Sequence, residues 1–132
     1  MIKVNDLRIG NWLYYTHTAK HPMQVIGVRN DWVSLDFAES REDEVNPIPL
    51  TEKLLKRLRF KNLGEESTRD TRILVFKKNE FYIGLDNGFW LLNHSNNSYY
   101  TFALRRLKYV HELQNAYYAM TGKELNIKLE WL

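Results

Sequence analysis

The chain has 132 residues, enough for one domain of ordinary size, and its 44% of hydrophobic residues can form a core without metal or disulfide support. It contains no cysteine, which excludes a disulfide framework, a thiolate zinc site and thiol catalysis. The net charge of +3 is too small to indicate a nucleic-acid partner by itself, and a charged fraction of 27% argues against a disordered chain.

The N-terminal third of the chain predicts three short strands. Residues 7–15 are rich in aromatics and interrupted by a glycine, residues 23–28 are mostly apolar, and residues 33–37 alternate between apolar and polar side chains. Asn30 and Asp31 tolerate positive φ and suit a tight hairpin between the second and third strands. We interpret this region as an SH3-like unit of three strands.

An acidic segment and a short helix follow. Residues 39–44 carry a net charge of −3 and predict a solvated acidic turn, which closes at Pro47 and Pro49 because proline interrupts regular ladders and helices. Thr51 is a favourable N-cap for a helix that runs to about Arg59. Its leucines fall on one side of the helix and its basic residues on the other.

The second half of the chain predicts a meander and a longer helix. Residues 62–70 are polar and predict a loop, and residues 71–104 then predict four strands. A helix is expected over 107–121, ended by Gly122 at a position that favours the left-handed conformation. Apolar and polar residues alternate over 125–131, which predicts a final strand with one buried face.

These elements predict an α+β protein that is mostly β: an SH3-like unit, a helix, a β-meander, a C-terminal helix and a final strand. We expect a single domain over 1–132, with 1–46 and 47–132 as candidate subunits. The sequence has no apolar run long enough to cross a membrane and no signal-peptide pattern at its start, so we expect a cytoplasmic protein.

The common catalytic signatures, among them the P-loop and the HExxH and GxSxG motifs, do not occur in the sequence. His17 and His21 are four residues apart, but they lie in a predicted loop without a third ligand nearby. The acids at 42–44 lack the spacing of a calcium loop. We therefore predict no catalytic residue, no metal, no cofactor and no enzymatic activity.

One face of the C-terminal helix has the composition of a contact surface. At helical spacing, His111, Gln114, Asn115 and Tyr118 share an outward face, and a tyrosine among amide and imidazole groups is typical of protein interfaces. These four residues are the candidate protein-binding site. The alternative is that this face packs on the N-terminal unit.

Two basic clusters provide a candidate nucleic-acid site. If they share one face, their cations would hold phosphates while neighbouring exposed aromatic rings stack on bases. If they do not, they are solvated faces of the fold. The residues concerned are Lys53, Lys56 and Arg57 on the first helix, and Arg105, Arg106 and Lys108 before the second.

Three segments resemble a known group of proteins. They are DLRIGNW at 6–12, NPIPLTE at 46–52, and YVHELQN at 109–115 continuing to TGKEL at 121–125. In this order they resemble an uncharacterised family of small proteins from Bacteroides-type bacteria and from their phages and prophages. That family has no established activity, so the resemblance transfers no catalytic residue and implies only a cytoplasmic accessory protein of a mobile element.

We therefore expect a non-enzymatic module that binds another protein, with nucleic-acid binding as the alternative. The predicted final strand would also offer an edge through which two copies could pair.

Overall fold

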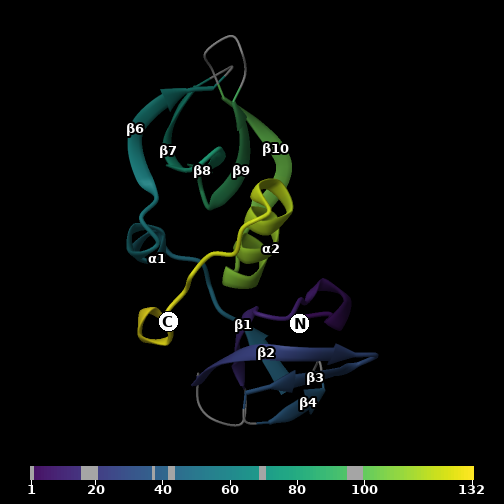
Figure 1. Ribbon diagram of the computed structural model, residues 1–132. Coiled ribbons are helices and arrows are strands. Elements are labelled where there is room, and N and C mark those ends of the chain that lie inside the picture. The colour runs from purple at the N-terminus through teal and green to yellow at the C-terminus, as the bar shows by residue number, and fades with distance from the viewer. Residues whose placement is uncertain (1, 16–20, 37, 42–43, 69–70, 95–99) are drawn as a thin grey trace.

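The computed structural model describes residues 2–15, 21–36, 38–41, 44–68, 71–94 and 100–132. Two five-stranded antiparallel sheets lie one above the other, with α2 between them (Figure 1). The prediction of a mostly β protein with two helices is confirmed.

The first sheet has the strand order β4-β3-β2-β1-β5. Its hairpin between β2 and β3 turns at Asn30, with a φ of +51°, as predicted. The two short outer strands differ from the prediction: β4 lies in the segment 39–44 that was expected to form an acidic turn, and β5 includes Pro47, which was expected to interrupt a ladder. Pro47 pairs with Leu13 at the sheet edge, where a missing N–H is tolerated. The strands are β1 (Trp12–Tyr15), β2 (His21–Arg29), β3 (Trp32–Leu35), β4 (Glu39–Arg41) and β5 (Val45–Pro47).

The second sheet is a meander of order β10-β9-β8-β7-β6. A parallel bridge between Thr68 and Tyr100 joins the end of β6 to the start of β10, so the sheet curls towards closure (Figure 1). The prediction of a loop over 62–70 is wrong, since most of this segment is strand. The strands are β6 (Lys61–Ser67), β7 (Arg72–Lys78), β8 (Phe81–Leu85), β9 (Phe89–His94) and β10 (Tyr100–Leu107).

Both helices are confirmed, with local signals at their ends. Thr51 caps α1 (Glu52–Arg57), its Oγ1 accepting a hydrogen bond from the Leu54 N–H at 3.2 Å. The second helix, α2 (Val110–Thr121), ends at Gly122 with a φ of +72°. It begins three residues later than expected because β10 continues to residue 107.

The predicted final strand is wrong. Residues 123–128 run without a strand partner, and Leu129–Trp131 form a 3₁₀ turn. Leu125 and Ile127 are nevertheless buried, because they pack into the core formed with both helices. The apolar alternation in the sequence therefore reflects burial of one side of the segment. This segment does not form the edge strand through which two copies were expected to pair.

Strand β1 connects two hydrophobic clusters. Leu13 is buried in the core of the first sheet, whereas Trp12 is buried among the leucines of α1 and the apolar face of α2. Successive strand residues point to opposite faces, so these adjacent side chains enter different cores. No helix among the described residues has the length and apolar character needed to cross a membrane.

Candidate functional site

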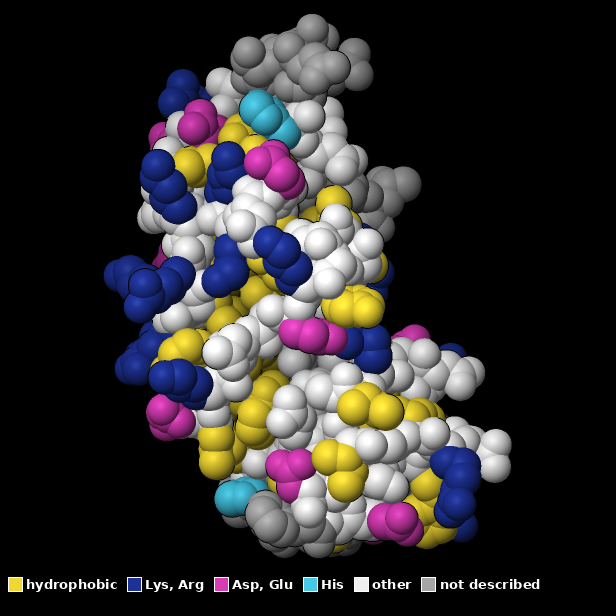
Figure 2. Space-filling model, in the orientation of Figure 1, with side chains coloured by type: hydrophobic (Ala, Val, Ile, Leu, Met, Phe, Trp, Pro, Cys, Tyr) yellow, Lys and Arg dark blue, Asp and Glu magenta, His cyan; other side chains and the backbone are white. Residues whose placement is uncertain are grey.

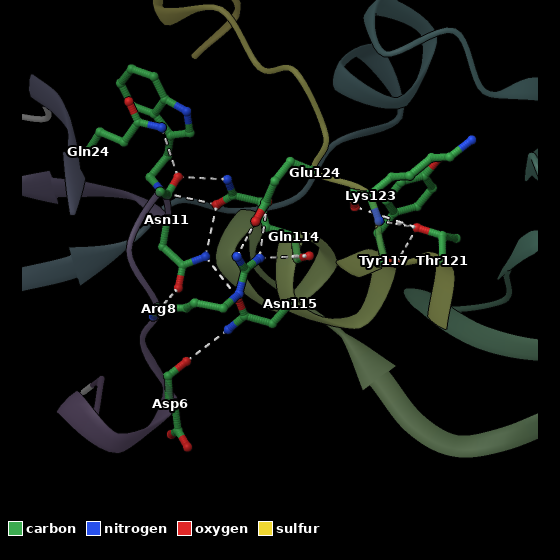
Figure 3. A network of polar contacts seen from close by, with 12 residues as sticks. Asp6, Arg8, Asn11, Gln24, Gln114, Asn115, Tyr117, Thr121, Lys123 and Glu124 are labelled. Atoms are coloured by element: carbon green, nitrogen blue, oxygen red, sulfur yellow. Dashed lines mark hydrogen bonds and ion pairs between the residues drawn. The ribbon is translucent and has the colours of Figure 1, made fainter. Parts of the chain in front are cut away.

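The face of α2 singled out in the sequence lies against the N-terminal segment (Figure 3). Gln114 is only 2% exposed. Its Oε1 accepts a hydrogen bond from the Trp12 backbone N–H at 2.9 Å, and its Nε2 donates to the Gly10 carbonyl at 3.0 Å. This amide therefore joins α2 to the turn that precedes β1.

Asn115 extends the same junction. Its Oδ1 accepts from Asn11 Nδ2 at 2.8 Å and from Arg8 Nε at 3.2 Å, while its Nδ2 donates to the Asp6 carbonyl at 2.9 Å. Arg8 also forms an ion pair with Glu124, which follows α2 (Figure 3).

Of the four predicted contact residues, Tyr118 has the largest exposed fraction, at 43%. The Arg8 guanidinium lies 4.4 Å from the centre of its ring. His111 is 5% exposed. The face thus serves mainly to pack the helix on the N-terminal segment, and it presents little more than one ring to a partner.

His111 borders a small cavity of about 230 Å³ that Asp6, Arg105, Glu112 and Asn115 also line. Its Nδ1 is buried without a hydrogen-bond partner among the described residues. Burial lowers the pKa of this imidazole below the ordinary value of 6.5, the carboxylates of Glu112 and Asp6 oppose the shift, and Arg105 adds to it.

In the second predicted basic cluster, Arg105 and Arg106 lie on β10 in two different surroundings, and Lys108 follows the strand. Arg105 lies by the cavity beside His111. Arg106 donates to the Asn87 carbonyl at 2.8 Å and stands 5.9 Å from the centre of the Trp90 ring. Neighbouring strand residues point to opposite faces, so these two arginines do not form one patch.

The cations of α1 also divide. Lys53 and Lys56 line a hollow with Phe60 and Phe76. Arg57 lines a different pocket, beside the C-terminal segment. There Arg57 lies with three further cations, Arg59, Lys78 and Lys128.

A shallow groove of about 650 Å³ crosses the second sheet; we call it the sheet groove. Lys61 on β6 pairs with Lys77 on β7, which in turn pairs with Tyr82 on β8, so two ammonium groups and a ring form one row across three strands. His94 is exposed and stacks on Tyr100, with ring centres 4.6 Å apart. The groove is lined by Arg59, Lys61, Leu63, Lys77, Lys78, Asn79, Glu80, Tyr82, His94 and Tyr100.

A second pocket of about 350 Å³ adjoins this groove and shares Arg59 and Lys78 with it. We call it the C-terminal pocket. The Lys78 ammonium donates a hydrogen bond to the Leu58 carbonyl at the end of α1. Burial lowers the pKa of Lys78, and the charge of Arg59 lowers it further. The lining residues are Arg57, Leu58, Arg59, Lys78, Asn126, Lys128 and Trp131.

Groove and pocket together gather six cations and one carboxylate, Glu80. Figure 2 shows Lys and Arg side chains collected on one side of the molecule, around α1 and β6. Of these six cations only Arg57 is among the candidate site residues predicted from the sequence, because Lys77, Lys78 and Lys128 come from distant segments and join the others only in the folded chain. The basic residues around 52–61 were the one local signal of this surface.

Among the described residues, no group of three or more His, Asp and Glu side chains is arranged to hold a metal ion. No family model, no curated protein and no solved structure matches the chain.

Proposed function

We propose that the protein binds single-stranded nucleic acid along the sheet groove and the C-terminal pocket. The observation that carries this proposal is the pairing of Lys61 with Lys77 directly across β6 and β7. Like charges placed opposite each other destabilise a sheet. A polyanion in the groove would turn this repulsion into binding energy.

The rings at the groove favour a single strand over a duplex. The exposed His94 ring and the half-buried Trp131 ring can each stack on a base only if that base is unpaired and splayed from its neighbours. Tyr82 and Tyr100 are buried against the His94 ring and support it rather than contact bases themselves. Burial, with the nearby Glu66 and Tyr82, raises the pKa of the Tyr100 phenol, so it remains uncharged.

Lys61→Ala tests the proposal without harming the fold. It removes an exposed cation and relieves the repulsion of Lys77, so the free energy of unfolding should stay the same or rise. Affinity for a labelled single-stranded oligonucleotide, measured by fluorescence anisotropy, should fall several-fold. The slope of log K against log salt should also become shallower by about 0.7, the contribution of one phosphate contact on a single strand.

Arg29→Ala is the matched control, because Arg29 is an exposed cation on β2 in the other sheet. It should leave the affinity and its salt slope unchanged. An affinity that does not vary with salt, or equal losses in both variants, would contradict nucleic-acid binding in this groove.

Protein binding is the second candidate function, and exposed apolar residues of the first sheet favour it. Ile26 on β2 is 56% exposed and Trp32 on β3 is 38% exposed, with the Arg41 guanidinium 5.3 Å from the Trp32 ring. We propose that β1 to β5 form an SH3-like unit. In support, β1 to β4 form a meander and β5 returns to pair with β1. A partner retained after nuclease treatment, lost with Trp32→Ser and kept with Lys61→Ala, would favour this function.

A further inference from the structure

The C-terminal pocket concentrates positive charge more strongly than the groove it adjoins. Arg57 is the last residue of α1, Arg59 follows that helix, Lys78 ends β7, and Lys128 lies in the segment after α2. No carboxylate stands among the described residues that line it. Four cations held together repel one another, and an anion bound between them would offset this repulsion.

Arg59 supports this reading through its backbone. Its φ is +66°, the left-handed region, at the position after a helix end where glycine is favoured. The other non-glycine residues described with positive φ are Asn30, Asn79 and Asn87, and asparagine tolerates this conformation. An arginine there strains the chain, and the strain is accounted for if its guanidinium is needed in the pocket.

The charge in the pocket suits a phosphate monoester. A terminal monoester carries about −1.5 to −2 charges near neutral pH, whereas a diester within a strand carries one. Two guanidinium groups can each bind the phosphate through paired N–H donors, and two ammonium groups add point charges.

The pocket also offers a surface for a base. Trp131 is half-buried, with the Lys128 ammonium 5.7 Å from the centre of its ring. The C-terminal segment runs below α1, on the side away from the second sheet (Figure 1). A nucleic-acid strand that follows the sheet groove past Arg59 and Lys78 would place its terminal nucleotide against this segment.

We propose that the C-terminal pocket binds the terminal phosphate monoester of the strand held in the sheet groove, with the terminal base against Trp131. This inference rests on the proposed function and specifies which part of the ligand the pocket recognises.

The test compares three labelled oligonucleotides of one sequence, carrying a 5′-phosphate, a 3′-phosphate or hydroxyl groups at both ends. One phosphorylated form should bind about tenfold more tightly than the hydroxyl form, as one or two additional charge-assisted hydrogen bonds would produce. A nucleoside monophosphate should compete for the pocket more weakly than the matching strand end, and the corresponding nucleoside should not compete.

Arg59→Gly separates binding from folding. It removes a cation and relieves the backbone at the same position, so the melting temperature should stay the same or rise while the preference for the phosphorylated end is lost. Lys61→Ala is the control, because it should weaken binding of phosphorylated and hydroxyl forms by the same factor.

Equal affinity for the three oligonucleotides, or a preference that survives Arg59→Gly, would overturn this inference and leave nucleic-acid binding in the groove intact. Binding of the monophosphate without binding of any oligonucleotide would overturn both the strand end and the proposed function, and would assign the pocket to a free nucleotide.

Discussion

At the scale of single residues, His111 makes the stability of the protein depend on pH. Because burial lowers its pKa in the folded state, the unfolded chain binds a proton at a higher pH than the folded chain does. The free energy of unfolding should therefore fall as the pH drops below 6.5, the ordinary value for histidine, and level off below the folded pKa. Arg105 strengthens this effect, and the nearby Asp6 and Glu112 limit it.

Urea unfolding between about pH 7.5 and about pH 5.5, a window in which histidine titrates, measures this slope. His111→Gln cannot gain the proton, so its stability should vary less across the window than that of the parent chain. His94→Gln, on an exposed ring, should keep the parent slope because His111 is still present. A His111→Gln slope equal to the parent slope would show that other groups set the pH dependence.

At the scale of elements, the centre of the second sheet depends on the absence of a side chain at Gly84. A Cβ there would lie 2.5 Å from Ile73 Cδ1 and 2.9 Å from Leu92 Cδ1, which are buried. Gly84→Ala should lower the free energy of unfolding by about 1–3 kcal/mol, as overpacking of a core does. In Gly27→Ala on β2, the new Cβ meets Ser34 Cβ at 3.4 Å, and the change should stay within about 0.5 kcal/mol. Equal losses in denaturant unfolding would refute this packing argument.

The sequence predicted the elements that have local signals. The Thr51 cap, the Asn30 turn and the Gly122 helix end each act within a few residues, and all three are present. Strand β6 is not predicted by the sequence because it lies at the edge of the sheet with all of its residues at least partly exposed, so it shows no apolar alternation. The alternation over 125–131 predicts a strand because Leu125 and Ile127 are buried on one side of the segment, although no strand among the described residues pairs with them.

The candidate site was harder to predict than the fold, for a topological reason. Lys61 and Lys77 are opposite each other only through the β6–β7 register, and Arg59 meets Lys128 only because the C-terminal segment returns to the end of α1. No local pattern encodes such meetings. Periodicity groups His111, Gln114, Asn115 and Tyr118 on one face of α2, but it could not show that the N-terminal segment covers Gln114.

At the scale of the whole molecule, α2 couples the two sheets. It contacts β8 and β10 above and β1 below, and Trp12 from the first sheet is buried in the cluster that α1 and α2 share (Figure 1). The candidate subunits 1–46 and 47–132 thus share a core side chain and a polar junction. We expect the chain to unfold in a single transition, with tryptophan fluorescence and far-ultraviolet circular dichroism giving the same midpoint.

Gln114→Ala tests this coupling at its most buried polar contact. The change leaves the Trp12 N–H without its partner, whereas the Gly10 carbonyl keeps the hydrogen bond that Gln24 Nε2 donates to it at 3.0 Å. An unsatisfied buried group costs about 1–3 kcal/mol, so the free energy of unfolding should fall by about that amount. Met120→Ala, on the same helix at a residue that is 50% exposed, should change it by less than about 0.5 kcal/mol. Because this junction joins the first sheet to α2, which packs on the second sheet, the fluorescence and circular dichroism signals should shift to the same lower denaturant midpoint. Separate midpoints in the parent chain, or a shift of only one signal in Gln114→Ala, would show that the two sheets fold independently.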